Sequence, residues 1–276
     1  MAQKVERPVF RAKDFVHLHL HTDYSLLQST IQLKPLAKRL KELDQKACAI
    51  TDFGNMYGAV SYFNVMLGSG IQPIIGIEAH LTFGSRFDRT STVGAGERGY
   101  YNIILLARNV EGYQNLIHLS SSAFTEGFHF KPRLDIELLS QRNKGLIGLS
   151  AGMDGAVGHF LLNGNEEMAL SNAKLFEDIF GAGNYFLEIQ DRVDERGQKL
   201  ISDTVALSKR SGIDLVATND VHYLKKDDAR AQQVLIAIGE GRTVGESRGM
   251  ESAVRYLRSA DEMWDTFGVG IAGISH

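Results

Sequence analysis

The chain has 276 residues, of which 43% are hydrophobic and 23% charged, a balance typical of a globular protein that packs its own core. Its formal net charge of −3 gives no electrostatic reason to expect direct nucleic-acid binding, which would need a local basic patch or a neighbouring domain. The polar first 14 residues lack the apolar core of a signal peptide, and no apolar stretch approaches the roughly 20 residues that span a bilayer, so we expect a cytoplasmic protein.

Short apolar runs alternate with amphipathic segments from about Phe15 to Tyr223. We expect strands at Phe15–Leu20, Ala47–Thr51, Pro73–Leu81, Tyr101–Ala107, Gly145–Ser150, Tyr185–Ile189 and Asp214–Thr218. Apolar residues at helical spacing predict intervening helices at Leu33–Leu43, Gly58–Leu67, Glu111–Phe124, Glu166–Ile179 and Lys199–Lys209. Two more helices are expected at Asp227–Ile238 and Ser259–Thr266.

The serial order of strands and helices predicts an α/β fold with right-handed crossovers and a parallel sheet. Seven such units suit a distorted seven-stranded (β/α)7 barrel, similar to a TIM barrel, better than an open sheet, and the carboxyl ends of its strands would carry the site. We expect a single domain over residues 1–276, with the barrel at about 14–243 and a C-terminal extension at 244–276. The single cysteine, Cys48, lies in an apolar run and is interpreted as a core residue.

The segment from Gly84 to Gly99 lacks periodicity and is rich in Gly, Ser, Thr and Arg, which predicts a mobile surface loop. Its basic residues Arg86, Arg89 and Arg98 are interpreted as solvated side chains, with contact to phosphate as the alternative.

Three histidines, His17, His19 and His21, alternate at the end of the first expected strand. Alternate side chains of a strand share one face, and imidazoles are good ligands for zinc, manganese or iron. Three in alternation favour a metal site or catalysis over histidines that are merely packed or solvated.

Two further patterns add carboxylates to these imidazoles. Glu78 lies in an apolar strand, where a charge is costly unless it is paired or bound to a metal. Asp220 and His222 stand two residues apart directly after the last expected strand. Each has a plausible role as a buried hydrogen-bonding group when taken singly, but together, at strand ends of one barrel, they predict a metal cluster.

Four motifs, in the right order, resemble those of the PHP (polymerase and histidinol phosphatase) family: His19–Thr22, Ala49–Asn55, Pro73–Glu78 and Val216–Tyr223. The stretches Ile104–Asn109, Gly112–Leu116, Phe128–Arg133 and Lys226–Ala231 are similar to the branch of the family found at the N-terminus of bacterial DNA polymerase III alpha subunits. The resemblance covers nearly the whole chain and implies a PHP-type barrel that leads toward a polymerase region. Nothing in the chain resembles a polymerase palm, so we expect an excised domain.

In this branch the resemblance implies a three-metal cluster, and only one ion keeps its full ligand set here, namely His19, His21, Glu78 and Asp220. From another set His222 remains, while Gln28 and Phe53 stand where the family pattern has an aspartate and a histidine. Asn102 and Gly152 stand where the second ion would take a histidine and a cysteine. Phe and Gly have no donor atom, and an amide carbonyl is a weak ligand for zinc or manganese. We therefore expect one divalent ion, zinc or manganese, or none.

The ligand losses favour a replication domain with a structural role, which docks a separate proofreading exonuclease beside the rest of the polymerase subunit and touches DNA only indirectly. The complete one-ion set supports the alternative, a weakly active metal-dependent 3′–5′ exonuclease or phosphoesterase, with His222 or Arg108 as a substitute group. A free-standing histidinol-phosphate phosphatase is disfavoured by the polymerase-like stretches.

Overall fold

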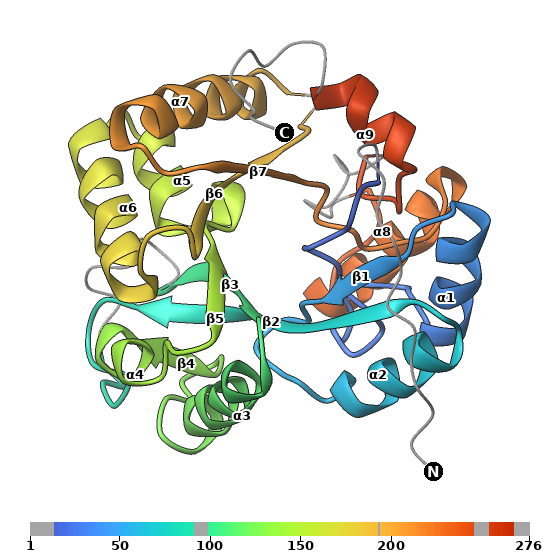
Figure 1. The fold of residues 1–276 in the computed structure, drawn as a ribbon, viewed down its shortest axis with the longest axis horizontal. Coiled ribbons are helices and arrows are strands. Elements are labelled where there is room, and N and C mark those ends of the chain that lie inside the picture. The colour runs from blue at the N-terminus through green and yellow to red at the C-terminus, as the bar shows by residue number, and fades with distance from the viewer. Residues whose placement is uncertain (1–13, 91–98, 193, 246–253, 268–276) are drawn as a thin grey trace. The chain divides into compact units, whose positions relative to one another are not determined.

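The computed structural model describes residues 14–90, 99–192, 194–245 and 254–267. These residues form two compact units (Figure 1). The first unit takes its residues from Met1–Ile50, Gly58–Ile74 and Val221–His276, and the second from Thr51–Tyr57 and Ile75–Asp220. The single domain that we expect over the whole chain stays a prediction.

The first unit packs helices against a short buried strand. Its elements are α1 (Leu33–Glu42), β1 (Ala47–Ile50), α2 (Ala59–Gly68), the 3-10 turn η3 (Lys226–Asp228), α8 (Ala229–Glu240) and α9 (Ala260–Phe267). The hydroxyl of Tyr62 in α2 donates to the carbonyl of Cys48 in β1 at 2.7 Å, which ties this helix to the strand. Burial raises the pKa of the Cys48 thiol to about 12, so the expected core role of this residue is confirmed.

The first expected strand, Phe15–Leu20, is reduced to two isolated bridges in the first unit. His17 bridges Cys48 of β1, and Leu20 bridges Val221, both in parallel. The amide of His21 donates to the Val221 carbonyl at 2.8 Å, and the Val221 amide donates to the His19 carbonyl at 3.1 Å. Val221 is therefore hydrogen-bonded between His19 and His21, so the closing motif lies beside the opening one.

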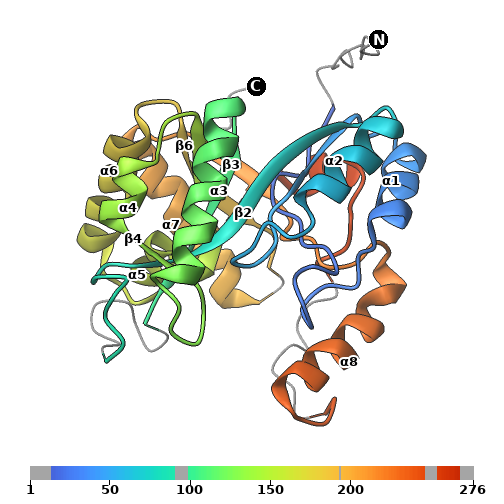
Figure 2. The ribbon, with the colours of Figure 1, turned by 90° about the horizontal axis from the view of Figure 1, so that it is seen from below.

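The second unit contains most of the sheet (Figures 1 and 2). Its elements are β2 (Gln72–Thr82, in this unit from Ile75), β3 (Tyr101–Ala107), α3 (Val110–Thr125), β4 (Arg133–Asp135), α4 (Ile136–Gln141), β5 (Leu146–Leu149), η2 (Gly152–Asp154), α5 (Ala156–Leu162), α6 (Glu166–Phe180), β6 (Tyr185–Gln190), α7 (Glu195–Ser211) and β7 (Leu215–Thr218). The short elements β4, α4 and α5 are absent from the sequence prediction. Among the described residues, no helix is both long and apolar enough to cross a membrane.

The strand order is β1-β2-β3-β5-β6-β7, with β4 paired to β2. The α/β class is confirmed, but the expectation of a wholly parallel sheet is wrong, because β3 runs antiparallel to both β2 and β5. The physical reason is the connection: no described helix lies between β2 and β3, so the chain returns without the crossover that a parallel pair needs. Among the described residues, no ladder of hydrogen bonds closes the seven strands into a barrel. Beyond the strand pairs, these residues form only isolated bridges.

Alternation along the strands gives the sheet of the second unit two different buried faces. One face carries apolar side chains such as Ile77, Ile103 and Leu187, which pack with residues of α3 to α7 in the hydrophobic core. The other face carries buried polar side chains, among them Glu78, Asn102, Glu188 and Gln190. Because buried polar groups must find partners, this second face is where the chemistry of the unit has to be sought.

Arg86 is not the solvated loop residue that the sequence suggests. Its side chain is 12% exposed, with Nε donating to Glu126 at 2.7 Å and Nη1 donating to Asp135 at 3.1 Å. Asp135 also caps the N-terminus of α4 by accepting from the Leu138 amide at 2.9 Å. Arg89 is exposed, as expected, and Arg98 lies outside the described residues.

Replacing Arg86 by Ala should lower the free energy of unfolding by about 3 kcal/mol, because the buried Asp135 carboxylate would lose its charged partner. The matched Arg89→Ala variant removes an exposed arginine from the same loop and should cost less than about 0.5 kcal/mol. Urea denaturation of both variants measures the difference, and equal losses would contradict the assigned role of Arg86.

Candidate metal centre

Two buried histidines of the first unit hold their ring nitrogens at a distance suited to one metal ion. The Nε2 atoms of His19 and His21 lie 3.2 Å apart, close to the roughly 3.4 Å that separates two ligand nitrogens around a tetrahedral zinc. The Nδ1 atom of His21 lies 3.0 Å from the Ser25 hydroxyl, which fixes the ring and leaves Nε2 pointing toward His19. A hydrogen bond at the second ring nitrogen is the usual support for a metal-binding histidine.

His222 belongs to the same cluster, but its ring nitrogen contacts an arginine. Its ring stacks on that of His21, with centroids 4.4 Å apart and planes inclined by 20°. Its Nδ1 lies 3.0 Å from the Gln28 carbonyl, which can only accept, so Nδ1 carries the proton and Nε2 is an acceptor. The guanidinium of Arg255 lies 3.3 Å from Nε2. The lone pair that would bind a metal therefore faces an N–H donor.

His17 has a different role from the other histidines. It is buried, and its Nε2 bonds the Arg258 carbonyl at 2.9 Å. Burial lowers its pKa to about 4, so the ring is neutral at pH 7. His17 is a core residue that ties the first strand segment to the C-terminal part of the unit.

In the second unit, Glu78 is 2% exposed and accepts a hydrogen bond of 2.7 Å from the side-chain amide of Asn102. This amide donor satisfies one carboxylate oxygen that a metal ion would otherwise bind. Phe53 forms a parallel bridge with Glu78, and its ring lies edge-on to His80 at 6.4 Å. Asn102 therefore contacts the Glu78 side chain, whereas Phe53 pairs with Glu78 through the backbone and directs its ring toward His80.

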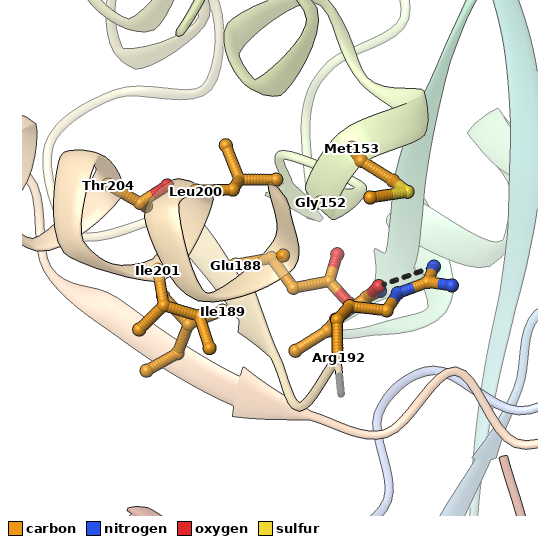
Figure 3. Close-up of a pocket in the computed structure, with 10 residues that line it drawn as sticks. Gly152, Met153, Glu188, Ile189, Arg192, Leu200, Ile201 and Thr204 are labelled. Atoms are coloured by element: carbon orange, nitrogen blue, oxygen red, sulfur yellow. Dashed lines mark hydrogen bonds between the residues drawn. The ribbon is translucent and has the colours of Figure 1, made fainter. Parts of the chain in front are cut away.

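A second buried carboxylate, Glu188, begins a chain of polar contacts that reaches Asp220. One oxygen of Glu188 accepts from the Thr218 hydroxyl and, at 3.0 Å, from the Gln190 amide. The Gln190 side-chain oxygen accepts from Arg192 at 3.2 Å, and Arg192 lies 3.5 Å from the Asp220 carboxylate. Figure 3 shows the pocket that Glu188 and Arg192 help to line. Asp220 itself has a positive φ of 46°, an uncommon conformation for a residue with a side chain.

Gly152 borders the same pocket (Figure 3). The end of the Gln190 side chain lies directly beside it. A Cβ atom at this position would lie 2.9 Å from the Gln190 amide carbon, closer than side chains pack, and φ is +53°. Gln190 thus occupies the space that any side chain at position 152 would need.

Sequence reasoning missed three partners of the candidate ligands, Ser25, Arg192 and Arg255. It also missed Glu188 and Gln190, which hold Arg192 in place. Glu188 could have been found, since it interrupts the apolar strand Tyr185–Ile189 just as Glu78 interrupts its own strand. Ser25 lies in irregular chain, and the other three lie far in sequence from at least one group that they contact. No periodic pattern in the sequence marks any of these four residues.

The PHP domain family model matches residues 17–192. The chain therefore belongs to the PHP family, and the resemblance inferred from its motifs is confirmed. The DNA polymerase III subunit alpha of Treponema pallidum is 41% identical over 256 residues, covering 92% of this chain and 22% of that protein. That of Deinococcus radiodurans is 42% identical over 259 residues, covering 91% and 19%. The chain spans about a fifth of the length of these relatives.

Among solved structures, an amidohydrolase from Chromobacterium violaceum is similar at a TM-score of 0.48 and 12% identity, covering 75% of this chain and 87% of that one.

The protonation of His17 should make the free energy of unfolding depend on pH. Its pKa falls from 6.5 to about 4 on folding, so its stabilising effect is present above pH 6.5 and is lost as the pH falls toward 4. Between pH 7 and pH 5 this loss amounts to about 2 kcal/mol. Urea denaturation should show that His17→Gln, although less stable at pH 7, loses less stability over this range than the unmodified chain. The exposed His118→Gln control should follow the unmodified chain, and an unchanged slope in His17→Gln would contradict the assignment.

Gly152→Ala should destabilise the second unit through two effects, the positive φ and the collision with Gln190. Gly164→Ala is the matched control, since Gly164 has φ +72° with no atom within 4 Å of its added Cβ, so it reports the backbone effect alone, about 1 kcal/mol. We expect Gly152→Ala to cost about 1–3 kcal/mol more than this control. Combining Gly152→Ala with Gln190→Ser should recover part of the excess in a double-mutant cycle, and simple additivity would refute the steric coupling.

Proposed function

We propose that this chain is the N-terminal PHP domain of a replicative DNA polymerase III alpha subunit, folded as a distorted (β/α)7 barrel. Its main role is structural, with docking of a proofreading exonuclease next to the rest of the polymerase subunit. The observation that carries this proposal is the packing of Gln190 over Gly152. A side chain that fills a lost ligand position and bonds its neighbours stabilises the fold without the ion.

We also propose which residues form the remaining site. His19, His21, Glu78 and Asp220 are the set that would hold one divalent ion, zinc or manganese, and His222 is the further histidine of this set. The 3.2 Å spacing of the two Nε2 atoms in the first unit supports the histidine half. Glu78 and Asp220, both buried in the second unit, are carboxylates of the kind that such ions bind. When bound, one such ion would lower the pKa of a bound water or polarise a phosphoryl oxygen.

The alternative is a weakly active 3′–5′ exonuclease or phosphoesterase that works with this one ion. In phosphate-ester hydrolysis at a site with several metals, the ions have different roles. One ion holds the hydroxide, and another stabilises the leaving oxygen. The hydrogen bonds of Asn102 to Glu78 and of Arg255 to His222 occupy atoms that further ions would need. These contacts favour the structural role over the enzymatic one.

Docking can be tested with the cognate proofreading exonuclease, added to the full polymerase subunit and to this chain. We expect a one-to-one complex by size-exclusion chromatography with light scattering. It should persist with EDTA and in a His19→Ala, Asp220→Asn variant, because docking does not use metal chemistry. Failure of the chain and the full subunit to bind would contradict the docking role.

Release of p-nitrophenol from its phosphate ester, with zinc or manganese added, tests the enzymatic alternative. We expect turnover of the unmodified chain to equal that of the His19→Ala, Asp220→Ala double variant, since only one ion has its ligands. Turnover that is well above background and disappears in the double variant would instead favour the phosphoesterase.

A further inference from the structure

We propose that Arg192 competes with a divalent metal ion for Asp220 and thereby sets the metal affinity of this chain. The inference deepens the proposed one-ion site and rests on it, because it concerns one of the four proposed ligands. All of the contacts that carry it lie within the second unit.

Arg192 is held in place by a series of buried groups rather than by Asp220 alone. Its Nη2 donates to the Gln190 side-chain oxygen at 3.2 Å, and the Gln190 amide donates to the buried Glu188 at 3.0 Å. Glu188 is fixed in turn by the Thr218 hydroxyl of β7 and, through its own amide, by the Ser150 hydroxyl at 2.8 Å. Groups other than Asp220 thus help to position the guanidinium at the pocket in Figure 3.

The Arg192–Asp220 contact is close enough to oppose a metal ion and loose enough to be displaced. The nitrogen lies 3.5 Å from one carboxylate oxygen, longer than the 2.7–2.9 Å of a strong charge-assisted hydrogen bond. The side chains of Arg192 and Asp220 are 18% and 8% exposed, so solvent screens their interaction only weakly. Since a guanidinium stays charged at all accessible pH values, it repels an incoming dication and shares the ligand oxygen with it.

In the first unit, a second candidate ligand also contacts an arginine. Arg255 lies 3.3 Å from the Nε2 lone pair of His222, the other chemistry-bearing residue of the closing motif. Both ligand candidates of the sequence Asp220-Val221-His222 therefore contact a guanidinium from their own unit. A cation built into the chain neutralises or occupies each ligand atom in the absence of a metal.

The test is equilibrium binding of zinc and of manganese to the 276-residue chain, by dialysis and elemental analysis. Arg192→Gln keeps a side chain that can bond Gln190 but removes the charge, and we expect its metal affinity to rise by about tenfold or more. Arg192→Lys keeps the charge and should stay within about threefold of the unmodified chain. Arg210→Gln is the control, because Arg210 is an arginine of the same unit that bonds Glu167 at 2.6 Å on the surface.

An affinity of Arg192→Gln that is equal to or weaker than that of the unmodified chain overturns the inference while leaving the one-ion site standing. Absence of binding by the unmodified chain, together with binding by Arg192→Gln, supports the inference in its strongest form. Absence of binding by both contradicts the one-ion site and the inference together. Should Arg192→Gln fail to fold by circular dichroism, zinc titration of the unmodified chain decides instead. The side-chain ¹⁵N–¹H resonance of Arg192 then shifts if the arginine is displaced and stays unchanged if the inference is wrong.

Discussion

Two carboxylates buried on one face of a sheet, Glu78 and Glu188, constrain most of what surrounds them in the second unit. A buried negative charge is stable only with a metal ion, a cation or hydrogen-bond donors close by. In this chain donors take that place: Asn102 bonds Glu78, while Thr218 and Gln190 bond Glu188. These hydrogen bonds to the two carboxylates all come from within the protein.

Hydrogen bonds and packing on this polar face connect positions that look independent in the sequence. Gly152 lacks a side chain, and Gln190 extends into the room that this leaves, where it also orients Arg192 toward Asp220. Phe53 pairs with Glu78 through the backbone and packs its ring edge-on to His80. A larger side chain at Gly152 alone would therefore disturb Gln190 and, through it, Arg192. The first unit differs, since its pair of histidines keeps a geometry that suits a metal.

Much of the fold follows from the sequence, because strands and helices with strong periodicity are local properties. The helices α1, α3 and α6 begin and end within about two residues of their predicted bounds, as does β3. The direction of β3 could not be predicted, since it depends on a connection that has no pattern of its own. The short elements β4, α4 and α5 escaped because so few residues carry too little periodicity.

The candidate ligands were predictable for a similar reason, and their partners were not. Imidazoles in alternation and a carboxylate in an apolar strand are visible in the chain itself, as His19, His21 and Glu78 illustrate. In the sequence, Arg192 and Arg255 look like ordinary surface arginines. Only the fold shows that they lie beside Asp220 and His222, respectively. The same holds for the loop residue Arg86, because its buried partner Asp135 lies far along the chain.

The number of ions that each chain binds tests the central claim most directly. Protein equilibrated with excess zinc or manganese, freed of unbound metal and measured by elemental analysis, should contain one ion per chain or none. Two or three tightly bound ions per chain would contradict the account, because they would require ligands where Gln28, Phe53, Asn102 and Gly152 now stand.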